Sequence, residues 1–345
     1  MIGYIVRRVL AMFAMLLVLS FMVFTMFAVL PADPARLTCG KGCTPQVIEG
    51  NRVRLGLDQP FLVQYARYLV AIPCGRVYPT SGPVLQCPVL DKQVETPPGT
   101  FLCPAPCLGY SFRRGEDVTA LIVAALPVTA ALAVGGVILW LVVGLSVGVL
   151  AALRRGRWQD RSAMGIALLG YSFPSFFIAL ILLYVFVLQL HWLPYPSYAP
   201  FSDDPIAWFQ TFLLPWVSIA ILYAAFYARL TRNQMLETLG EDYIRTARAK
   251  GLPERTVIYK HALRAGITPV VTSVGLDFAA LLGGAIIIEQ VFTLPGLGKL
   301  TLESTLDADL SVISGTVLLA GFFVIVANLI VDILYASIDP RVRLT

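Results

Sequence analysis

Two long apolar runs without charged residues most strongly limit what this chain can fold into. Val9–Leu30 holds no charge over 22 residues, and Val118–Leu153 holds none over 36. A helix of about 20 residues, rising about 1.5 Å per residue, crosses a hydrocarbon layer of about 30 Å. The 345-residue chain is also 57% hydrophobic and 14% charged, whereas a soluble protein is roughly half apolar and a quarter charged. These features predict an all-α polytopic membrane protein.

Six apolar runs are long enough to be expected as transmembrane helices. Arg7 and Arg8 ahead of the first run also suit a secretory signal, but the run is long for one and no small-x-small cleavage site ends it. Pro127 is expected to divide the longest run into a short entry segment and a span. The six expected spans are Val9–Leu30, Val128–Ala152, Ser162–Leu190, Ile206–Ala228, Val270–Ile288 and Leu310–Val331.

Basic residues are distributed unevenly between the two ends of these spans. Four arginines lie within 154–161, eight lysines or arginines within 229–264 and two after the last span, whereas residues 191–205 contain none. Because short basic loops stay in the cytoplasm, both termini are expected there. The expected divisions are residues 1–30 with the cytoplasmic N-terminus and first span, an extracellular or periplasmic segment at 31–117, and a membrane core at 118–345 with a cytoplasmic loop at 229–268.

All six cysteines lie between the first two expected spans. An even number in an oxidising compartment predicts disulfides, and a zinc site built on the two C-x-x-x-C pairs is the alternative. The part from about 73 to 107 is rich in proline and glycine and needs cross-links in place of a hydrophobic core. Ahead of it, Asn51–Val70 is expected to be helical. The disulfide candidates are Cys39, Cys43, Cys74, Cys87, Cys103 and Cys107.

The basic stretch RTARAKGLPERTVIYKHALR, Arg245–Arg264, has the pattern of two short helices. Glu241–Lys250 begins with acids and ends with bases, as the helix dipole favours, and Gly251 can adopt the left-handed conformation that ends a helix. Pro253 suits the start of a second helix. We therefore predict a helix-turn-helix across the inner membrane face. An amphipathic surface helix, or a charged loop that only fixes topology, are the alternatives.

Several stretches resemble the permease subunits of ABC importers, and in particular the first permease of the dipeptide/oligopeptide/nickel branch. Ala247, Gly251 and Leu263 match the family's cytoplasmic EAA coupling loop, and Thr246–Gly251 matches the branch's own form of it. Further matches are Tyr4–Leu10, Leu30–Pro34, Leu55–Pro60, Glu289–Gly298 and Asn328–Arg343. Arg245, Thr246, His261 and Arg264 depart from the general EAA pattern. The resemblance covers nearly the whole chain except about 73–107, which looks like an insertion.

The resemblance implies a type I ABC importer permease fold with six transmembrane helices and a disulfide-containing extracellular insertion between the first two. It implies a multi-pass protein of the bacterial inner membrane that takes up di- and oligopeptides. The implied partners are a second homologous permease subunit, one or two cytoplasmic ATPase subunits that bind ATP and Mg²⁺, an extracellular solute-binding protein and membrane lipid. No cofactor, metal, catalytic residue or nucleic acid is expected for this chain, which lacks the G-x-x-x-x-G-K-[ST] motif.

Two sets of residues are expected to carry this function. The ATPase-coupling candidates are Thr246, Ala247, Arg248, Lys250, Gly251, Arg255 and Leu263. The pathway candidates are Tyr171, Ser172, Ser175, Asp277 and Glu289. A charge within a span costs about 2.5–3.5 kcal/mol on insertion scales. For Asp277, contact with a peptide amine or a cation and a hydrogen bond between helices are both open. Glu289, near the end of its span, suits packing or gating better than substrate binding.

Other functions have weaker support in the sequence. The same type of complex can import nickel or another small solute. A stand-alone channel or secondary carrier often shows internal repeats, and none is found here. A receptor would need a cytoplasmic output domain, yet the longest inner loop is only about 36 residues. An intramembrane enzyme would need a nucleophile–base pair or a metal cluster within the spans, and the sequence shows neither.

Overall fold

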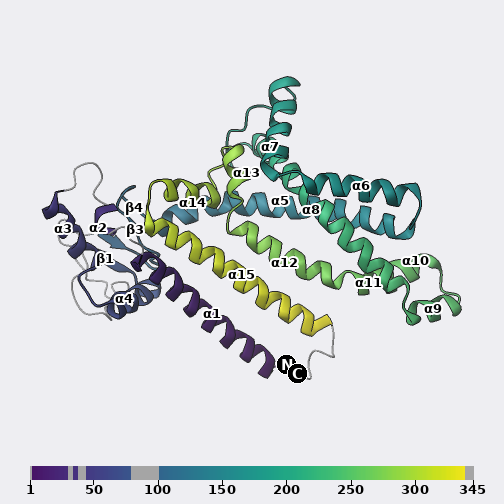
Figure 1. The fold of residues 1–345 in the computed structure, drawn as a ribbon, viewed down its shortest axis with the longest axis horizontal. Helices are drawn as coiled ribbons and strands as arrows, with labels where there is room; N and C mark the ends of the chain where they lie inside the picture. Colours follow the sequence, from purple (N-terminus) through teal and green to yellow (C-terminus); the bar gives the residue numbers. More distant parts are fainter. Residues whose placement is uncertain (1, 30–33, 38–43, 79–100, 339–345) are drawn as a thin grey trace. The chain divides into compact units, whose positions relative to one another are not determined.

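The computed structural model describes residues 2–29, 34–37, 44–78 and 101–338, most of which are helical (Figure 1). The chain divides into two compact units, Met1–Pro127 with Leu300–Ile325, and Val128–Lys299 with Val326–Thr345. Three helices each pass from one unit into the other: α5 (Val118–Leu153), α14 (Leu297–Leu306) and α15 (Leu310–Ile338).

The first unit joins one long helix to a group of short helices and strands. Its other elements are α1 (Ile2–Val29), α2 (Pro34–Leu37), α3 (Pro45–Leu55), α4 (Phe61–Cys74), β1 (Arg76–Tyr78), β2 (Phe101–Cys103), β3 (Tyr110–Ser111) and β4 (Glu116–Asp117). The strands form two small antiparallel pairs, with Val77 opposite Leu102 in one and Ser111 opposite Glu116 in the other.

The described part of the second unit is helical. Its other elements are α6 (Trp158–Ser172), α7 (Ser175–Leu183), the π-helical η2 (Tyr184–Gln189), α8 (Pro205–Leu239), α9 (Asp242–Ala249), α10 (Glu254–Thr256), the π-helical η3 (Val257–Ala262), α11 (Leu263–Gly266), α12 (Thr268–Leu282) and α13 (Ile286–Val291). Helix α8 is its central element, because α6, α7, α11, α12 and α13 all pack on it.

Among the described residues, four helices are long and apolar enough to cross a membrane, namely α1, α5, α8 and α15. Two bent helix pairs raise the number to six if each pair is one span. One pair joins Trp158–Ser172 to Ser175–Gln189 with a bend of 96°, and the other joins Glu254–Gly266 to Thr268–Leu282 with a bend of 49°. The fold is therefore a helical one with four to six helices or helix pairs of membrane-crossing length.

Three of the expected spans differ from the helices in the structure. The third, Ser162–Leu190, is broken at Pro174 between α6 and α7. Helix α5 runs without a break through Pro127, because a proline removes only one backbone hydrogen bond and Val128 and Thr129 beyond it are firmly buried. The fifth expected span, Val270–Ile288, is not one helix, since α12 ends at Leu282. Gly284 has a φ of 120° there, a conformation that other residues rarely adopt, and the helical hydrogen bonding stops.

The expected helix over Asn51–Val70 is divided in two. Helix α3 ends at Gly56, whose φ of 70° lets its backbone amide bond Arg52 and Val53 carbonyls as a left-handed cap. Pro60 then precedes α4. Helix α4 packs along α1, where Phe21 lies 5.2 Å from Tyr65 between ring centroids. Gly56 and Pro60 thus divide the expected helix, and its second part, α4, packs on α1.

The described cysteines support cross-linking of the outer segment. Cys103 and Cys107 form a disulfide, and Cys74 is also disulfide-bonded. The zinc alternative is excluded for the Cys103–Cys107 pair, because the two sulfur atoms are joined. These two cysteines pack with Ala71 and Tyr78 in a small apolar cluster. The other three candidates, Cys39, Cys43 and Cys87, lie outside the described residues.

We expect the Cys103–Cys107 disulfide to resist mild reduction in the folded protein. Both residues are buried, with 0% and 1% of their surface exposed, so a reductant has little access to the sulfur atoms. Maleimide labelling after mild reduction, read by peptide mass spectrometry, should modify both cysteines only when the protein is denatured first. Ready labelling of either cysteine in the folded, reduced protein would contradict this expectation.

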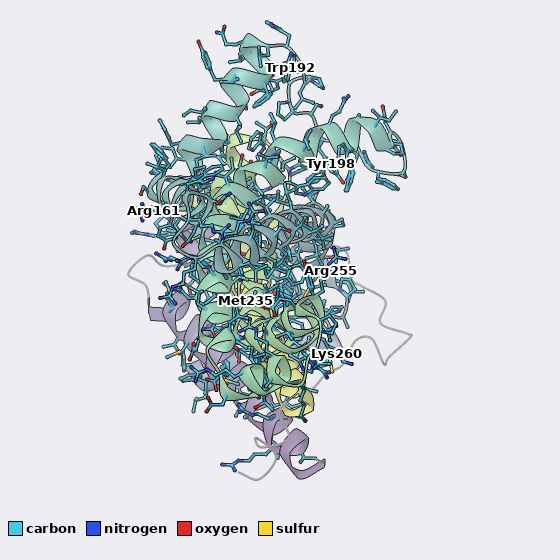
Figure 2. All side chains as sticks on the ribbon, turned by 90° about the vertical axis from the view of Figure 1, so that its right-hand side faces the viewer. Arg161, Trp192, Tyr198, Met235, Arg255 and Lys260 are labelled. Carbon is cyan, nitrogen blue, oxygen red and sulfur yellow. A yellow bond between two sulfur atoms is a disulfide. The ribbon has the colours of Figure 1, made fainter. Side chains whose placement is uncertain are left out.

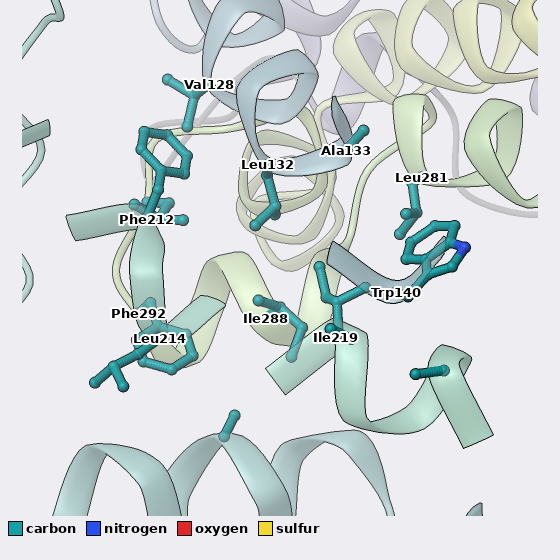
Figure 3. Packing of buried hydrophobic residues seen from close by; sticks show 14 of the residues in the cluster. Val128, Leu132, Ala133, Trp140, Phe212, Leu214, Ile219, Leu281, Ile288 and Phe292 are labelled. Atoms are coloured by element: carbon teal, nitrogen blue, oxygen red, sulfur yellow. The ribbon is translucent and has the colours of Figure 1, made fainter. Parts of the chain in front are cut away.

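Large side chains from α5, α8 and α13 fill the core of the second unit (Figure 3). Trp140 and Phe212 are completely buried in it. Helix α5 approaches α8 closely because glycines face it. A Cβ at Gly135 would collide with the Trp216 ring, and one at Gly148 would lie 2.7 Å from the Ala228 carbonyl oxygen. This close packing fixes the two helices that carry the candidate site.

Candidate functional site

Residues 242–266, called here the α9–α11 hairpin, form the helix-turn-helix predicted from the sequence. Helix α9 ends at Ala249, and Gly251 turns the chain with a φ of 75°. The Gly251 amide donates to the Arg248 carbonyl over 2.9 Å, and Pro253 precedes α10. Glycine adopts this left-handed turn conformation at no steric cost, unlike most other residues, which is why the hairpin bends at this residue.

The hairpin is packed against the ends of α5 and α8 through a separate apolar cluster. Ile244, Val257 and Ala262 of the hairpin are completely buried with Met235 of α8 and Ala152 of α5. Because this apolar face is covered by protein, the hairpin is neither a loose charged loop nor a helix whose apolar face lies in lipid. It packs directly on the end of α8.

The outer face of the hairpin is basic and partly aromatic. Figure 2 labels Arg255 and Lys260 on the hairpin and Met235 of α8. The exposed residues of this face include the coupling candidates Thr246, Arg248, Lys250, Gly251 and Arg255, together with Tyr243, Leu252 and Tyr259. The other two coupling candidates are not exposed on this face. Ala247 is buried in the apolar cluster, and Leu263 is partly buried against it. Of the seven predicted residues, five are therefore exposed to a possible partner and two help to pack the hairpin against the rest of the chain.

Arg248 makes an ion pair within the hairpin. Its Nη2 and Nε atoms donate to Glu254 over 2.7 and 3.2 Å and so bridge the turn at Gly251. The hydrogen bond to Glu254 raises the pKa of Arg248, and the same bond lowers the pKa of the Glu254 carboxyl. The coupling candidate Arg248 thus pairs with an acid of its own chain.

Breaking the Arg248–Glu254 pair is expected to have a small, salt-sensitive effect. Both side chains are exposed, so Arg248→Glu should cost about 1 kcal/mol or less, and the exchange Arg248→Glu with Glu254→Arg should restore the loss. The pair forms at neutral pH and its contribution is lost as the pH falls through the lowered pKa of Glu254. Thermal unfolding at low and at about 1 M salt checks this. A large loss that salt leaves unchanged would contradict it.

Three pathway candidates lie at the bend between α6 and α7. Tyr171 and Ser172 end α6, and Ser175 begins α7 after Pro174. The Ser172 hydroxyl donates to the Leu168 carbonyl over 2.7 Å, so it is used within its own helix. The guanidinium of Arg229 lies 5.8 Å from the centre of the Tyr171 ring. Among the described residues, these three form no hydrogen bond with Asp277 or Glu289.

Asp277 lies in α12 and contacts α8. The Tyr227 hydroxyl donates to Asp277 Oδ2 over 2.5 Å. Tyr227 itself is completely buried, and its ring stacks with that of Trp140 at 6.0 Å between centroids. Tyr223, one turn earlier in α8, stacks closer to Trp140 at 4.5 Å. The helix-to-helix hydrogen bond considered from the sequence is therefore present, and Asp277 remains only partly buried.

Glu289 is completely buried and tied to the chain around it. Thr129 Oγ1 donates to its Oε1 over 2.9 Å, and the Lys299 amide donates to its Oε2 over 2.9 Å. The Ala285 amide donates to Oε1 as well, over 3.2 Å. Gly296 lies against the carboxylate so closely that a Cβ would collide with it. Glu289 thus joins three parts of the chain, namely its own helix α13, helix α5, and the start of α14 with the turn that precedes it. This agrees with a packing role.

Sequence reasoning missed the partners of these charged residues. It named neither Tyr227 nor Thr129, and it overlooked the pair of Asp160 with Arg232, whose guanidinium donates to both carboxylate oxygens over 2.6 and 2.8 Å. Two signals were present in the sequence. Asp160 is an acid within a basic loop, and Tyr223 and Tyr227 share one face of a helix at a spacing of four residues.

No group of three or more histidine, cysteine, aspartate or glutamate side chains that could hold a metal ion occurs in the part of the chain that the structure describes. The remaining chemistry of the site is that of a basic hairpin and of a carboxylate next to tyrosines inside a helical bundle.

Comparisons with known proteins identify the family. Residues 144–344 match the model of the binding-protein-dependent transport system inner membrane component, and residues 1–133 match the model of its N-terminal region. A Brucella abortus protein provisionally named a peptide transport system permease protein is 38% identical over 343 residues, 99% of each chain. The glutathione transport system permease protein GsiC of Escherichia coli is 37% identical over the same share.

One solved structure adds a likeness of fold. A chain of the MetNI methionine ABC transporter in inward-facing conformations aligns with a TM-score of 0.51 at 19% identity, covering 64% of this chain and 97% of its own length. The matched family model spans more than half of this chain, and two relatives match it over nearly their full length. The chain belongs to the binding-protein-dependent transport system inner membrane components, the permease family of ABC importers.

Proposed function

We propose that this chain is a permease subunit of an ATP-driven importer of di- and oligopeptides, and that the α9–α11 hairpin transmits ATP-dependent movement to its transmembrane helices. The observation that carries the coupling role is the close packing of the hairpin on α8 through buried apolar residues, with its basic face exposed. The names of the relatives, a peptide permease and a glutathione permease, support the class of substrate.

The packing explains how movement would pass into the membrane. Helix α8 continues for 35 residues from Pro205 to Leu239 without a break. The hairpin packs on its end, and Gly266 lies so close to α8 that a Cβ there would be 3.3 Å from Thr238 Oγ1. Because a close-packed contact is nearly incompressible, a push on the hairpin displaces α8 rather than being absorbed.

The partners and orientation follow from the same proposal. The exposed basic and aromatic face binds one or two cytoplasmic ATPase subunits, which bind ATP and Mg²⁺, so this chain needs no cofactor or catalytic residue of its own. A second homologous permease completes the pathway, and an extracellular solute-binding protein delivers the peptide. The chain spans the bacterial inner membrane six times, with both termini in the cytoplasm. The coupling set is Thr246, Ala247, Arg248, Lys250, Gly251, Arg255 and Leu263.

Reconstituted transport tests the proposal. The chain is co-expressed with its second permease and ATPases, placed in proteoliposomes and supplied with the solute-binding protein and peptides of increasing length. We expect accumulation of peptide that needs both ATP and the binding protein. Accumulation without ATP would support a stand-alone carrier instead, and accumulation of a nickel chelate but of no peptide would support the metal-importing alternative.

A further inference from the structure

Asp277 is a carboxylate within an apolar helix, and no cationic side chain pairs with it among the residues that the structure describes. Its one hydrogen-bond partner there is the neutral hydroxyl of Tyr227. A tyrosine hydroxyl orients a carboxylate but does not neutralise it. Charges within membrane spans normally face a pathway or a protein neighbour and pair with an opposite charge. Asp277 is thus a carboxyl group held in position within the bundle, and the described residues supply no cation to pair with it.

The surroundings of Asp277 limit which cation fits. Ca²⁺ takes six to eight oxygen ligands, and Mg²⁺ needs an octahedral set of about six. The described residues offer no cluster of several acidic, histidine or cysteine side chains. A primary ammonium group needs only about three hydrogen-bond acceptors. Asp277 is partly exposed and supplies two carboxylate oxygens, whose lone pairs can accept these bonds, while the completely buried Tyr227 only orients them.

Aromatic rings next to the carboxylate also favour an ammonium group. Tyr223 lies one helical turn from Tyr227 on the same face of α8 and is only partly buried. Its ring is held by stacking on Trp140 at 4.5 Å between centroids. The faces of such rings attract organic cations. Gly144 of α5 supports the arrangement from behind, since a Cβ there would lie 2.8 Å from Tyr227 Cβ.

We propose that Asp277, oriented by Tyr227 and flanked by the partly exposed ring of Tyr223, binds the amino-terminal ammonium group of the peptide during its passage. This site rests on the proposed function and gives it a substrate requirement, a free primary amine. The binding is reversible and involves no covalent step. Tyr227 keeps the carboxylate oriented across the α8–α12 contact. The ammonium group binds to the part of Asp277 that remains exposed.

The test compares two peptides of one sequence, with a free and with an acetylated amino terminus, in proteoliposomes of the complete complex. The solute-binding protein has a preference of its own, so the measured quantity is the ratio of the two uptake rates, compared between wild-type and variant permease with the same binding protein. We expect Asp277→Asn to lower uptake of the free-amine peptide about tenfold and to leave the acetylated peptide unchanged. Glu237→Gln removes an exposed acid elsewhere on α8 and should keep the wild-type ratio.

A second variant keeps the test decisive if Asp277→Asn does not assemble. Tyr223→Leu leaves the carboxylate in place and removes the ring, and we expect a loss of about threefold for the free-amine peptide alone. An equal loss for both peptides in either variant would mean that Asp277 serves assembly or pairs with the second permease, which overturns the site. Wild-type complex that takes up neither peptide would overturn the proposed function itself.

Discussion

Replacing Glu289 by alanine is expected to destabilise the protein by about 3 kcal/mol or more and to lower the recovery of folded permease sharply. The change would leave three donors without their acceptor, namely the Thr129 hydroxyl and the Ala285 and Lys299 amides. Each unsatisfied buried donor costs about 1–3 kcal/mol. Thermal unfolding of the detergent-purified protein, together with its yield as a single species in size-exclusion chromatography, measures the effect.

Two further variants separate the carboxylate's role from the loss of side-chain volume. Glu289→Gln keeps the shape but turns one oxygen into a donor that faces other donors, so an intermediate loss is expected. Gly296→Ala leaves Glu289 in place and pushes a Cβ into its carboxylate, which should also be strongly destabilising. The control Glu237→Ala removes an exposed glutamate of α8 and should stay within about 0.5 kcal/mol of wild type. A normal unfolding temperature for Glu289→Ala would contradict the assigned role.

The positions of the apolar helices could be predicted from the sequence because a membrane span depends on local composition alone. The charge-free run at Val118–Leu153 coincides with α5 to the residue. The Gly251 turn was equally predictable, since glycine, proline and the charge order act locally. What local sequence could not decide was which prolines interrupt a helix. Pro127 lies inside α5, whereas Pro174 separates α6 from α7 with a bend of 96°. The difference comes from the packing around each proline.

The contacts that define the candidate site are the part that the sequence could not reveal. Tyr227 and Asp277 are 50 residues apart, Arg232 and Asp160 are 72 apart, and Thr129 and Glu289 are 160 apart. Periodicity identifies a helix face but not the residue that meets it from another helix. The sequence therefore placed Asp277 and Glu289 together as charges needing an explanation. The structure separates their roles. Asp277 is a partly exposed carboxylate, whereas Glu289 is completely buried and hydrogen-bonded to the chain around it.

Replacing Gly251 by valine is expected to reduce ATP-driven uptake at least about tenfold while the complex still assembles. Gly251 has a φ of 75°, and a left-handed conformation costs a residue with a side chain roughly 1–2 kcal/mol, more for a β-branched one. No atom lies within 4 Å of the added Cβ, so the strain is relieved by rearrangement of the turn rather than by a clash. That rearrangement separates Arg248 from Glu254 and lets α9 move relative to α10. Uptake and ATPase stimulation by the loaded binding protein are the measurements.

A matched glycine in the same chain distinguishes loss of coupling from simple instability. Gly156, in the turn between α5 and α6, has a φ of 77° and also has open space around its Cβ. Gly156→Val therefore introduces the same backbone strain outside the hairpin, and it should lower stability similarly without uncoupling transport. Gly251→Asn should stay near wild type, because asparagine tolerates the left-handed region. If Gly156→Val and Gly251→Val reduced transport equally, the defect would be due to loss of stability rather than to loss of coupling. Full transport by Gly251→Val would mean that the hairpin does not need a fixed turn to couple ATP hydrolysis to α8.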